Sequence, residues 1–432
     1  MKVDVAPSLL RGRLLIPAGK SEAQRLVAMA TLCDGESLIK NFPVNDDAAA
    51  ALRCAVALGA EVRAIDSGIV VRGNPRESFK VLPDIVELDC GESGLTSRLF
   101  TCIASLYSKE IKVLGSGSLM KRPFDSFHAV FDALGIEFFS DAGSLPLVIH
   151  GPMNPRDITI DGSISSQFVS GWLVAMSAHY EQRKLIVHGL TSFPYIELTV
   201  QYLQAFGVRW VYGSDGVFVK ENGVLQAAQI QVPSDWSSAA VMLVAAALCA
   251  DDKLDLFGLD RDSVHADKAI LHLLSMAEIP TEWSSEGDSI RVYKKQPRAF
   301  DFDFSDCPDL VPVAMVLAAA SDGECTFHNT QRLRYKESNR GRVMQEEFGK
   351  SGIVVEVMEN EIRVRPGVGK RALFSSQGDH RIAMAMTVFA MANQGGEVEG
   401  VQCVHKSYPQ FFNDLLRLEA KLYLSEDDES LK

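Results

Sequence analysis

Residues 57–62 read Ala-Leu-Gly-Ala-Glu-Val, and this short pattern returns along the chain. Residues 133–138 read Ala-Leu-Gly-Ile-Glu-Phe, and residues 205–210 read Ala-Phe-Gly-Val-Arg-Trp. Helices commonly end at a glycine in the left-handed conformation, and the β-favouring residues that follow it begin a strand. The pattern therefore predicts a helix, a glycine cap and a strand at each of these three places.

Fainter copies continue the pattern at Gly352, Glu278 and Glu419, the last two without a glycine. The central positions are 59, 135, 207, 278, 352 and 419, so the spacings are 76, 72, 71, 74 and 67 residues. Six units of 72 residues would fill the 432-residue chain. Periods this long lie outside the usual solenoid repeats, so we expect each unit to be a small α/β module.

Length and composition describe an ordinary globular protein of two or three domains, with 47% apolar and 23% charged residues. The N-terminal stretch has no apolar run long enough for a secretory signal. The longest apolar run, residues 239–250, is typical of a buried helix and too short to span a bilayer. We therefore expect a cytoplasmic protein with no membrane partner.

The cysteine spacing and the net charge exclude further kinds of site and partner. The eight cysteines form no C-x-x-C pair, so we expect buried thiols rather than a zinc site or a disulfide framework. A net charge of -13 argues against nucleic acid as a partner, because phosphate backbones need a basic field. Small anionic substrates remain compatible, since they need only a local basic pocket.

One such basic segment is Arg-Leu-Arg-Tyr-Lys-Glu-Ser-Asn-Arg, residues 332–340. If it is helical, Arg332, Lys336 and Arg340 are four apart and share one face, with Glu337 among them. A charge run taken alone is more often a solvated helix surface. The alternative is that three neighbouring cations surround a bound anion.

Helix starts elsewhere carry cations too. Asp309 and Asp379 are natural N-caps, and Ser21 with Gln24 matches a capping box. Cations placed in these same first turns oppose the helix dipole, which makes sense if an anion binds there. Lys20 and Ser21 suggest a phosphate loop, but Leu14 stands where that motif needs glycine, so a P-loop nucleotidase is not expected.

Taken in order, several segments resemble the 5-enolpyruvylshikimate-3-phosphate synthase family over residues 11–412. They are Lys20-Ser21 with Arg25, Lys121-Arg122-Pro123, Ser165-Ser166-Gln167, Ser192 to Tyr195, Pro308-Asp309, Lys336-Glu337 with Arg340, Asp379-His380-Arg381 and Lys406 to Pro409. The resemblance implies an α/β (α+β) fold, a two-domain inside-out α/β barrel with six βαβαββ repeats, three per domain. It implies domains of residues 20–230, and of residues 1–19 with 231–432.

The resemblance also implies transfer of the enolpyruvyl group of phosphoenolpyruvate to the 5-hydroxyl of shikimate 3-phosphate, with release of phosphate, in a cleft between the domains that closes on ligands. Both substrates carry a carboxylate and a phosphate, which arginine and lysine bind well. The implied phosphoenolpyruvate-binding residues are Lys20, Gly94, Arg122, Gln167, Arg340, His380, Arg381 and Lys406. The implied shikimate 3-phosphate-binding residues are Lys20, Ser21, Arg25, Ser165, Ser166, Ser192, Tyr195, Asp309 and Lys336.

The reaction needs a base for the hydroxyl and an acid for the methylene carbon. We assign Asp309 to the first role and Glu337 to the second, with Lys20 and Lys336 stabilising charge or moving protons. No metal or organic cofactor is expected, and the protein is expected to be a monomer.

Some positions depart from the family pattern. Glu92 and Leu95 stand where Asn and Thr are usual, and Arg332 stands where some members have Asn. A carboxylate at Glu92 would repel phosphoenolpyruvate unless it faces Arg98 or Arg122. The alternatives are the sister transferase that uses a UDP-amino sugar, whose reactive Cys is absent from residues 115–121, and a catalytically silent ligand-binding relative.

Overall fold

The computed structural model describes residues 1–75, 78, 80–179, 181–213 and 215–425. The chain divides into two compact units: Ala18–Pro233, here the N-domain, and Met1–Pro17 with Ser234–Lys432, here the C-domain. The chain therefore passes between the units at residues 17–18 and 233–234. The sequence-based boundaries, after residues 19 and 230, differ from these points by two and three residues.

Three four-stranded sheets form the N-domain in its described residues, with strand orders β14-β3-β5-β4, β6-β7-β9-β8 and β10-β11-β13-β12. In each of these orders, the first strand lies parallel to the second, the second pairs antiparallel with the third, and the third pairs antiparallel with the fourth, which lies at the edge. The strands are β3 (Glu36–Lys40), β4 (Glu61–Ile65), β5 (Gly68–Arg72), β6 (Ile85–Asp89), β7 (Glu110–Leu114), β8 (Glu137–Asp141), β9 (Ser144–His150), β10 (Ile158–Asp161), β11 (Arg183–His188), β12 (Arg209–Tyr212), β13 (Val217–Asn222) and β14 (Gln229–Gln231).

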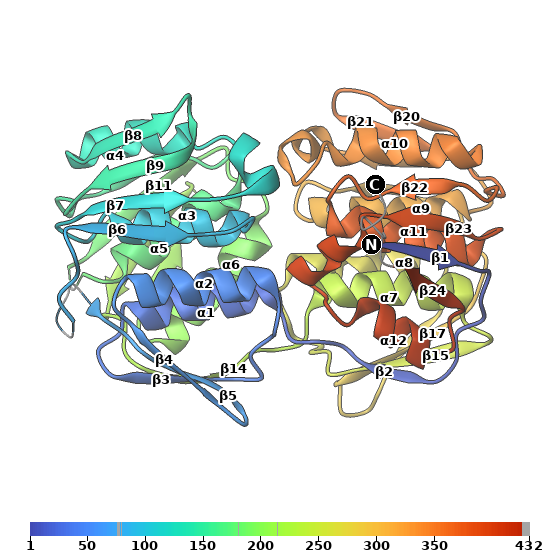
Figure 1. Ribbon diagram of the computed structural model, residues 1–432, viewed down its shortest axis with the longest axis horizontal. Coiled ribbons are helices and arrows are strands. Elements are labelled where there is room, and N and C mark those ends of the chain that lie inside the picture. Colours follow the sequence, from blue (N-terminus) through green and yellow to red (C-terminus); the bar gives the residue numbers. More distant parts are fainter. Residues whose placement is uncertain (76–77, 79, 180, 214, 426–432) are drawn as a thin grey trace, which may run out of the picture. The chain divides into compact units, whose positions relative to one another are not determined.

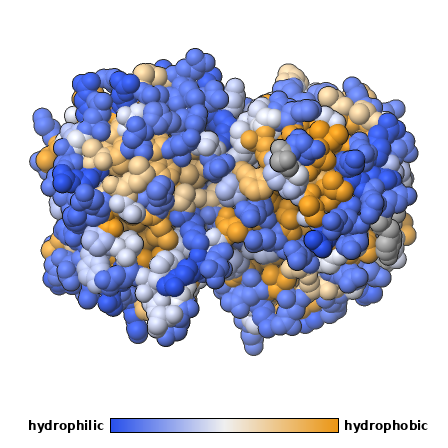
Figure 2. All heavy atoms as spheres, turned by 180° about the vertical axis from the view of Figure 1, so that it is seen from behind, coloured by the Kyte–Doolittle hydropathy of each residue, from blue (hydrophilic) through white to orange (hydrophobic). Residues whose placement is uncertain are grey.

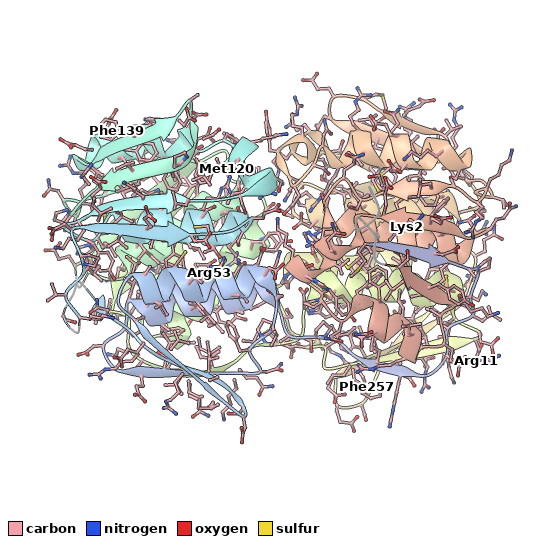
Figure 3. The ribbon with its side chains drawn as sticks, viewed as in Figure 1. Lys2, Arg11, Arg53, Met120, Phe139 and Phe257 are labelled. Atoms are coloured by element: carbon pink, nitrogen blue, oxygen red, sulfur yellow. The ribbon has the colours of Figure 1, made fainter. Side chains whose placement is uncertain are left out.

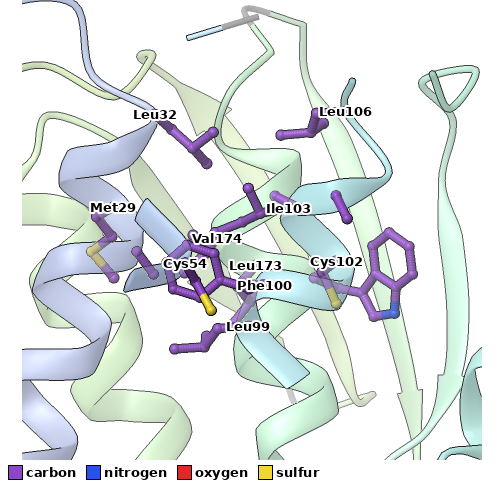
Figure 4. Packing of buried hydrophobic residues seen from close by; sticks show 14 of the residues in the cluster. Met29, Leu32, Cys54, Leu99, Phe100, Cys102, Ile103, Leu106, Leu173 and Val174 are labelled. Carbon is purple, nitrogen blue, oxygen red and sulfur yellow. The ribbon is translucent and has the colours of Figure 1, made fainter. Parts of the chain in front are cut away.

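Helices of the N-domain divide into inner and outer ones. The inner helices are α1 (Lys20–Thr31), α3 (Gly94–Ala104) and α5 (Ser166–Met176). The others are α2 (Asp46–Ala57), η2 (Gly117–Lys121), η3 (Asp125–Phe127), α4 (His128–Leu134) and α6 (Phe193–Ala205). Every residue of α3 is buried, so it has no solvent face, and Figure 4 shows Leu99, Phe100 and Ile103 packed near Met29 and Leu173. Helices thus fill the inside and sheets cover them.

The C-domain repeats this arrangement, with strand orders β16-β17-β15-β2, β18-β19-β21-β20 and β22-β23-β1-β24. Its strands are β1 (Lys2–Val5), β2 (Arg13–Leu15), β15 (Lys253–Phe257), β16 (Thr281–Trp283), β17 (Ser289–Tyr293), β18 (Asp301–Asp303), β19 (Cys325–His328), β20 (Val355–Val357), β21 (Glu361–Val364), β22 (Leu373–Ser375), β23 (Gly396–Glu399) and β24 (Leu422–Ser425). The inner helices are α7 (Trp236–Cys249), α9 (Val311–Ala319) and α11 (His380–Ala392).

Shorter and outer helices complete the C-domain (Figure 1): η4 (Ala266–Ala269), α8 (Ile270–Met276), η5 (Pro308–Leu310), η6 (Gln331–Tyr335), α10 (Arg340–Ser351), η7 (Val401–Lys406) and α12 (Phe411–Arg417). The predicted buried helix at residues 239–250 corresponds to α7, whose residues from Ala239 to Ala247 are all buried. The six βαβαββ units and the inside-out α/β arrangement confirm the predicted fold class.

Three repeats are completed by segments from elsewhere in the chain. Strand β14, at the end of the N-domain, is the first strand of the repeat that contains α1, and it pairs parallel with β3. Strand β2 pairs parallel with β15, and β1 pairs antiparallel with both β23 and β24. Although β1 and β2 precede the N-domain in the sequence, they pair with strands of the C-domain. The first residues of the chain therefore belong to the C-domain.

All six predicted repeat positions have a left-handed backbone. The φ angles are 86°, 70°, 87° and 90° at Gly59, Gly135, Gly207 and Gly352. Glu278 and Glu419, the two positions without glycine, have φ angles of 56° and 70°. The repeat therefore imposes its helix-ending turn even where the residue has a side chain that disfavours it.

Two local predictions were wrong, and the helix considered for residues 332–340 is not formed. Asp309 lies within η5 and makes no side-chain cap, and α1 begins after Gly19 without a capping box. The Gln24 amide instead donates to Ser93, Thr96 and the Asp47 carbonyl, because it is fully buried among them. Residues 332–340 do not form one helix. Lys336 is extended, and it separates the 3-10 turn η6 from α10.

Cysteines and surface residues agree with the composition. All eight cysteines lie in the described part as free thiols, seven of them buried. Within the described residues, no helix has both the length and the apolar character needed to cross a membrane. Hydrophilic residues predominate on the face in Figure 2, although apolar patches are visible. Figure 3 shows exposed side chains such as Arg53, which pairs with Asp89 at 2.9 Å.

Candidate active site

In the N-domain, the predicted site residues lie mainly at the starts of the inner helices. Lys20 is the first residue of α1, Gly94 is the first of α3, and Ser166 is the first of α5. The Ser165 hydroxyl caps α5 by accepting from the Gln167 amide at 3.3 Å. The backbone N–H groups at the starts of these helices favour bound anions.

Lys20 and Arg25 are both held by buried partners. The Lys20 ammonium lies 3.0 Å from Oδ2 of Asp47, a buried residue of α2 that the sequence did not single out. Arg25 is 2% exposed and donates to Thr199 Oγ1 at 2.8 Å and to the carbonyls of Ser21 and Tyr195. Burial lowers the pKa of Arg25, only partly offset by nearby Glu22 and tyrosines. The acceptors of these three hydrogen bonds are neutral oxygens, so the bonds do not neutralise the positive charge of the guanidinium.

Gly94 has a packing role in this cluster. A Cβ at Gly94 would overlap with the guanidinium of Arg122, which lies against the glycine backbone. Arg98 is buried beside them, with its guanidinium carbon 4.4 Å from the centre of the Phe124 ring. Glycine at 94 therefore leaves room for the guanidinium of Arg122, another predicted site residue, in the position that it has here.

The Glu92 carboxylate accepts hydrogen bonds from the backbone amide and the hydroxyl of Ser118, at 3.2 and 3.0 Å. Ser118 lies in η2, directly before Arg122, so Glu92 ties the start of α3 to this turn. Leu95 is buried in the second position of α3. Glu92, which departs from the family pattern, is therefore held by Ser118 within the N-domain.

Ser192 and Tyr195 begin α6. Ser192 is buried with a φ angle of 53°, a left-handed conformation that is uncommon for serine. The Tyr195 carbonyl accepts from Arg25 and from the Thr199 hydroxyl, so α6 is joined to α1. We call Lys20, Ser21, Arg25, Gly94, Arg122, Ser165, Ser166, Gln167, Ser192 and Tyr195 the N-domain cluster.

In the C-domain, Asp309 is surrounded by three cations. Its Oδ1 lies 3.0 Å from the Lys336 ammonium and 2.6 Å from Nη1 of Arg340. Its Oδ2 lies 3.3 Å from Nη2 of Arg381. Burial alone would raise the pKa of Asp309, but these three cations hold it well below its usual range. Asp309 is therefore ionised at neutral pH.

Arg340 is the centre of this group, with 1% of its side chain exposed. Besides Asp309, it contacts Oε2 of Glu337 at 2.6 Å and Oδ2 of Asp379 at 2.8 Å. Burial would lower the pKa of Arg340, but the carboxylates of Asp379, Glu337 and Asp309 raise it well above its usual value. The arginine thus holds three acids in fixed positions.

Lys336 and Lys406 complete the cluster. Burial lowers the pKa of Lys336, with Asp309 acting in the opposite direction. The Lys406 ammonium lies 3.9 Å from Oε1 of Glu337, whose side chain is 11% exposed. Glu337 therefore lies between two cations. We call Asp309, Lys336, Glu337, Arg340, His380, Arg381 and Lys406 the C-domain cluster.

Asp379 was predicted only as an N-cap. It does cap α11, accepting from the Arg381 amide at 3.0 Å, and the next residue, His380, is buried. Its carboxylate also binds Arg340, which the sequence could not show because the two residues are 39 apart. Two further residues were missed: the Ser237 hydroxyl accepts from Arg381 at 3.0 Å and donates to Asp267. The polar pair at the start of α7 could have indicated Ser237, whereas Asp267, in η4, had no such signal.

Apart from Gly94, both clusters consist of residues from the segments that carried the resemblance, and a family model described as EPSP synthase (3-phosphoshikimate 1-carboxyvinyltransferase) matches residues 5–415. The chain belongs to the EPSP synthase family. Members of this family are transferases, so the chain is an enzyme of that class. The family assignment expected from the sequence is confirmed.

Individual relatives agree with this assignment. The chain is 32% identical over 423 residues to a 3-phosphoshikimate 1-carboxyvinyltransferase of Clostridium novyi, covering 95% of this chain and 96% of the relative. It is also 32% identical over 430 residues to one of Halobacterium salinarum, covering 97% and 99%.

Solved structures show the same fold. An EPSP synthase from Acinetobacter baumannii superposes with a TM-score of 0.81 at 22% identity, covering 98% of this chain and 100% of the other. The enolpyruvyl transferase NikO from Streptomyces tendae gives a TM-score of 0.77 at 16% identity, covering 98% of each chain.

Proposed function

We propose that this enzyme transfers the enolpyruvyl group of phosphoenolpyruvate to the 5-hydroxyl of shikimate 3-phosphate, releasing inorganic phosphate. Family membership supports the reaction, and one geometric observation carries the mechanism. Asp309 and Glu337 contact different nitrogens of the same buried arginine, Arg340, at 2.6 Å each. Two carboxyl groups held in one rigid cluster suit a reaction that needs both a base and an acid.

In the proposed mechanism, Asp309 is the base. Its carboxylate is ionised, and it accepts the proton of the 5-hydroxyl as the oxygen forms a bond to C2 of phosphoenolpyruvate. Glu337 acts in its protonated form and donates a proton to the methylene carbon, which becomes a methyl group. A methyl proton then returns to the Glu337 carboxylate as the bond between C2 and the phosphate oxygen breaks, which restores the double bond. The released phosphate takes up the proton that Asp309 accepted.

Lys336 contacts Asp309 directly, and its lowered pKa suits a group that can transfer a proton. Lys20 holds a corresponding position in the N-domain cluster through its ion pair with Asp47. We assign both lysines to charge stabilisation and proton movement during the addition and elimination steps.

Substrate binding uses residues of both domains in this proposal. Shikimate 3-phosphate is bound by its phosphate at Ser165, Ser166 and Ser192 and by its carboxylate at Arg25, with Lys20, Ser21, Tyr195, Lys336 and Asp309 near the rest of the molecule. Arg25 suits a carboxylate because it is a buried cation whose hydrogen bonds reach neutral oxygens.

Phosphoenolpyruvate is bound by its phosphate at Lys20, Arg122, Gln167 and Lys406, with Gly94 and His380 beside it, and by its carboxylate at Arg340 and Arg381. Arg340 already donates to three carboxylates. These bonds use four of its five N–H donors, so the remaining Nη1 donor is the one that we assign to the substrate carboxylate.

Phosphate release tests the proposal. Purified protein is incubated with phosphoenolpyruvate and either shikimate 3-phosphate or UDP-N-acetylglucosamine, and released phosphate is measured over time. We expect release with the shikimate ester alone. Release with the UDP-sugar alone would assign the sister reaction, and no release with either acceptor would indicate a ligand-binding relative without activity.

The proposal includes a monomeric, cytoplasmic enzyme that needs no metal or organic cofactor. Sedimentation of the purified protein tests the monomer, and the phosphate-release assay after treatment with a chelator tests the cofactor. A dimer, or activity that is lost with the chelator and restored by a divalent ion, would correct these two points.

A further inference from the structure

Arg332 is a cation of the charged segment that the proposed mechanism does not use. It lies in η6, is partly buried, and donates from Nη2 to the backbone carbonyl of Ser305. Ser305 belongs to the irregular connection between β18 and η5, and η5 contains Asp309. Arg332 therefore links the segment that ends at Lys336 to the segment that leads to Asp309.

The two segments have a second link, because the Lys336 ammonium contacts Oδ1 of Asp309 at 3.0 Å. One segment runs from Arg332 to Lys336, and the other runs from Ser305 to Asp309. Along each segment, the two linked residues are four positions apart. A single ion pair fixes one point on each segment and leaves rotation about it possible. Two links fix the separation and the orientation together.

The rest of the local structure supports a defined position for this connection. The Ser305 amide donates to Oδ1 of Asp303 at 2.7 Å, and the Asn329 amide group donates to the same oxygen at 2.9 Å. Asn329 stands directly before Thr330 and η6. These contacts orient the Ser305 carbonyl toward η6, where Arg332 reaches it.

We propose that Arg332 is a positioning residue that, through the Ser305 carbonyl, holds the Asp309 segment at the distance from Lys336 that proton transfer requires. This inference rests on the proposed function for its catalytic consequence, although the link between the segments is a structural claim of its own. Arg332 acts through Asp309 and Lys336.

The charge of Arg332 also affects the pKa of Lys336, and this effect can be measured separately. Lys336 is faced by Asp309 from η5, by Arg340 from α10, by the adjacent Glu337 and by Arg332 from η6. Arg381 of α11 reaches Asp309, and Lys406 of η7 reaches Glu337. Arg332 and Arg340 both lower the pKa of Lys336, after the larger effect of burial. Removing the Arg332 charge should raise the pKa of Lys336.

The test compares Arg332→Lys, Arg332→Gln and Arg332→Ala with the matched control Arg334→Gln. Arg334 lies in the same turn but is exposed, and its Nε donates only locally, to the Gln331 carbonyl at 2.8 Å. We measure kcat, KM for both substrates and the pH dependence of kcat. Hydrogen exchange at the amides of residues 305–310 reports on the segment directly.

For Arg332→Ala we expect kcat to fall by about tenfold or more, with KM for phosphoenolpyruvate changed less than about threefold. In Arg332→Gln the basic limb of the pH profile should move up by about half a unit or more, and Arg332→Lys should leave it in place because the charge is kept. Exchange at residues 305–310 should be faster in the Ala and Gln variants than in the control.

The proposal is overturned if the Arg332 variants match Arg334→Gln in kcat, pH profile and exchange. Failure of the proposed function would be recognised separately, because the unmodified protein would then show no phosphate release while the exchange comparison still tests the link. A fall in kcat with unchanged exchange would also contradict it, since Arg332 would then act on the substrate rather than on the segment. If Arg332→Ala does not fold, the Lys and Gln variants carry the same comparison.

Discussion

Gly349, inside helix α10, and Gly352, which caps the end of this helix, should respond in opposite ways to the same added methyl group. Gly352 ends the helix with a φ angle of 90°, whereas Gly349 lies three residues earlier, within the helix. A Cβ at either position would meet nothing within 4 Å. Substitution by alanine therefore changes backbone preference alone, without steric clash, at both positions.

The magnitudes follow from backbone conformation. The left-handed conformation costs an L-residue about 1–2 kcal/mol. Alanine also loses less conformational entropy on folding than glycine, and this difference offsets the cost by about 0.4–1 kcal/mol. Gly352→Ala should therefore lower the free energy of unfolding by about 1 kcal/mol. Gly349→Ala should raise it by about 0.5–1 kcal/mol, because alanine is preferred over glycine inside a helix.

Equilibrium urea unfolding of the full chain measures the difference. Fluorescence from Trp236 and Trp283 reports on the C-domain, and Trp172 and Trp210 report on the N-domain. With an m-value of about 2–3 kcal/mol/M, the midpoint should fall by about 0.4 M in Gly352→Ala and rise by about 0.3 M in Gly349→Ala. Midpoints that move in the same direction, or a Gly352→Ala variant more stable than the unmodified protein, would refute the reasoning.

Three further predictions concern the site and the thiols. Glu337→Gln should lower kcat by about 100-fold or more with little change in substrate binding, whereas Glu346→Gln, on the exposed face of α10, should leave both unchanged; equal losses in kcat and binding would make Glu337 structural. Because the pKa of Asp309 is depressed in the folded protein, its stabilising contribution is fully present above the unfolded value of about 3.9 and is lost as pH falls toward the folded pKa. The difference in unfolding free energy between the unmodified protein and Asp309→Asn should therefore be constant from pH 7 to about 4 and decrease below it; a decrease already near pH 6 would contradict the depressed pKa. Burial raises the pKa of Cys403 to about 12 and that of Cys102 well above its usual value, so iodoacetamide at pH 8 should label the native thiols at least about tenfold more slowly than the unfolded ones. Rapid labelling of the native protein would show that the thiols are accessible.

Some features of the site could be predicted because they depend on residues close in sequence. The Asp379 cap of α11 is one, since an N-cap contacts amides two residues away. The cations at helix starts are another, and their residues do form the two clusters. The same local reasoning failed at Asp309 and at Gln24, because both side chains found partners from distant elements that outweigh a cap.

The charged segment at residues 332–340 shows where local reasoning ended. Arg332, Lys336 and Arg340 would share one face if the segment were a single helix, but a 3-10 turn and an extended residue precede α10. Lys336 and Arg340 nevertheless meet, because both contact Asp309 from a different segment of the chain. Arg332 turns instead toward Ser305, a contact that no periodicity could predict.

Residues close together in the chain account for the six repeats and their helix-ending turns, including the left-handed Glu278 and Glu419. These turns depend on short-range sterics and on the spacing of apolar residues, and both are set by residues close together in the sequence. Tertiary structure alone decided which charges neutralise each other, as in the contact of Arg340 with Asp309 and Asp379, 31 and 39 residues away. Burial makes these ion pairs strong, and burial is a property of the packed domain rather than of any short segment.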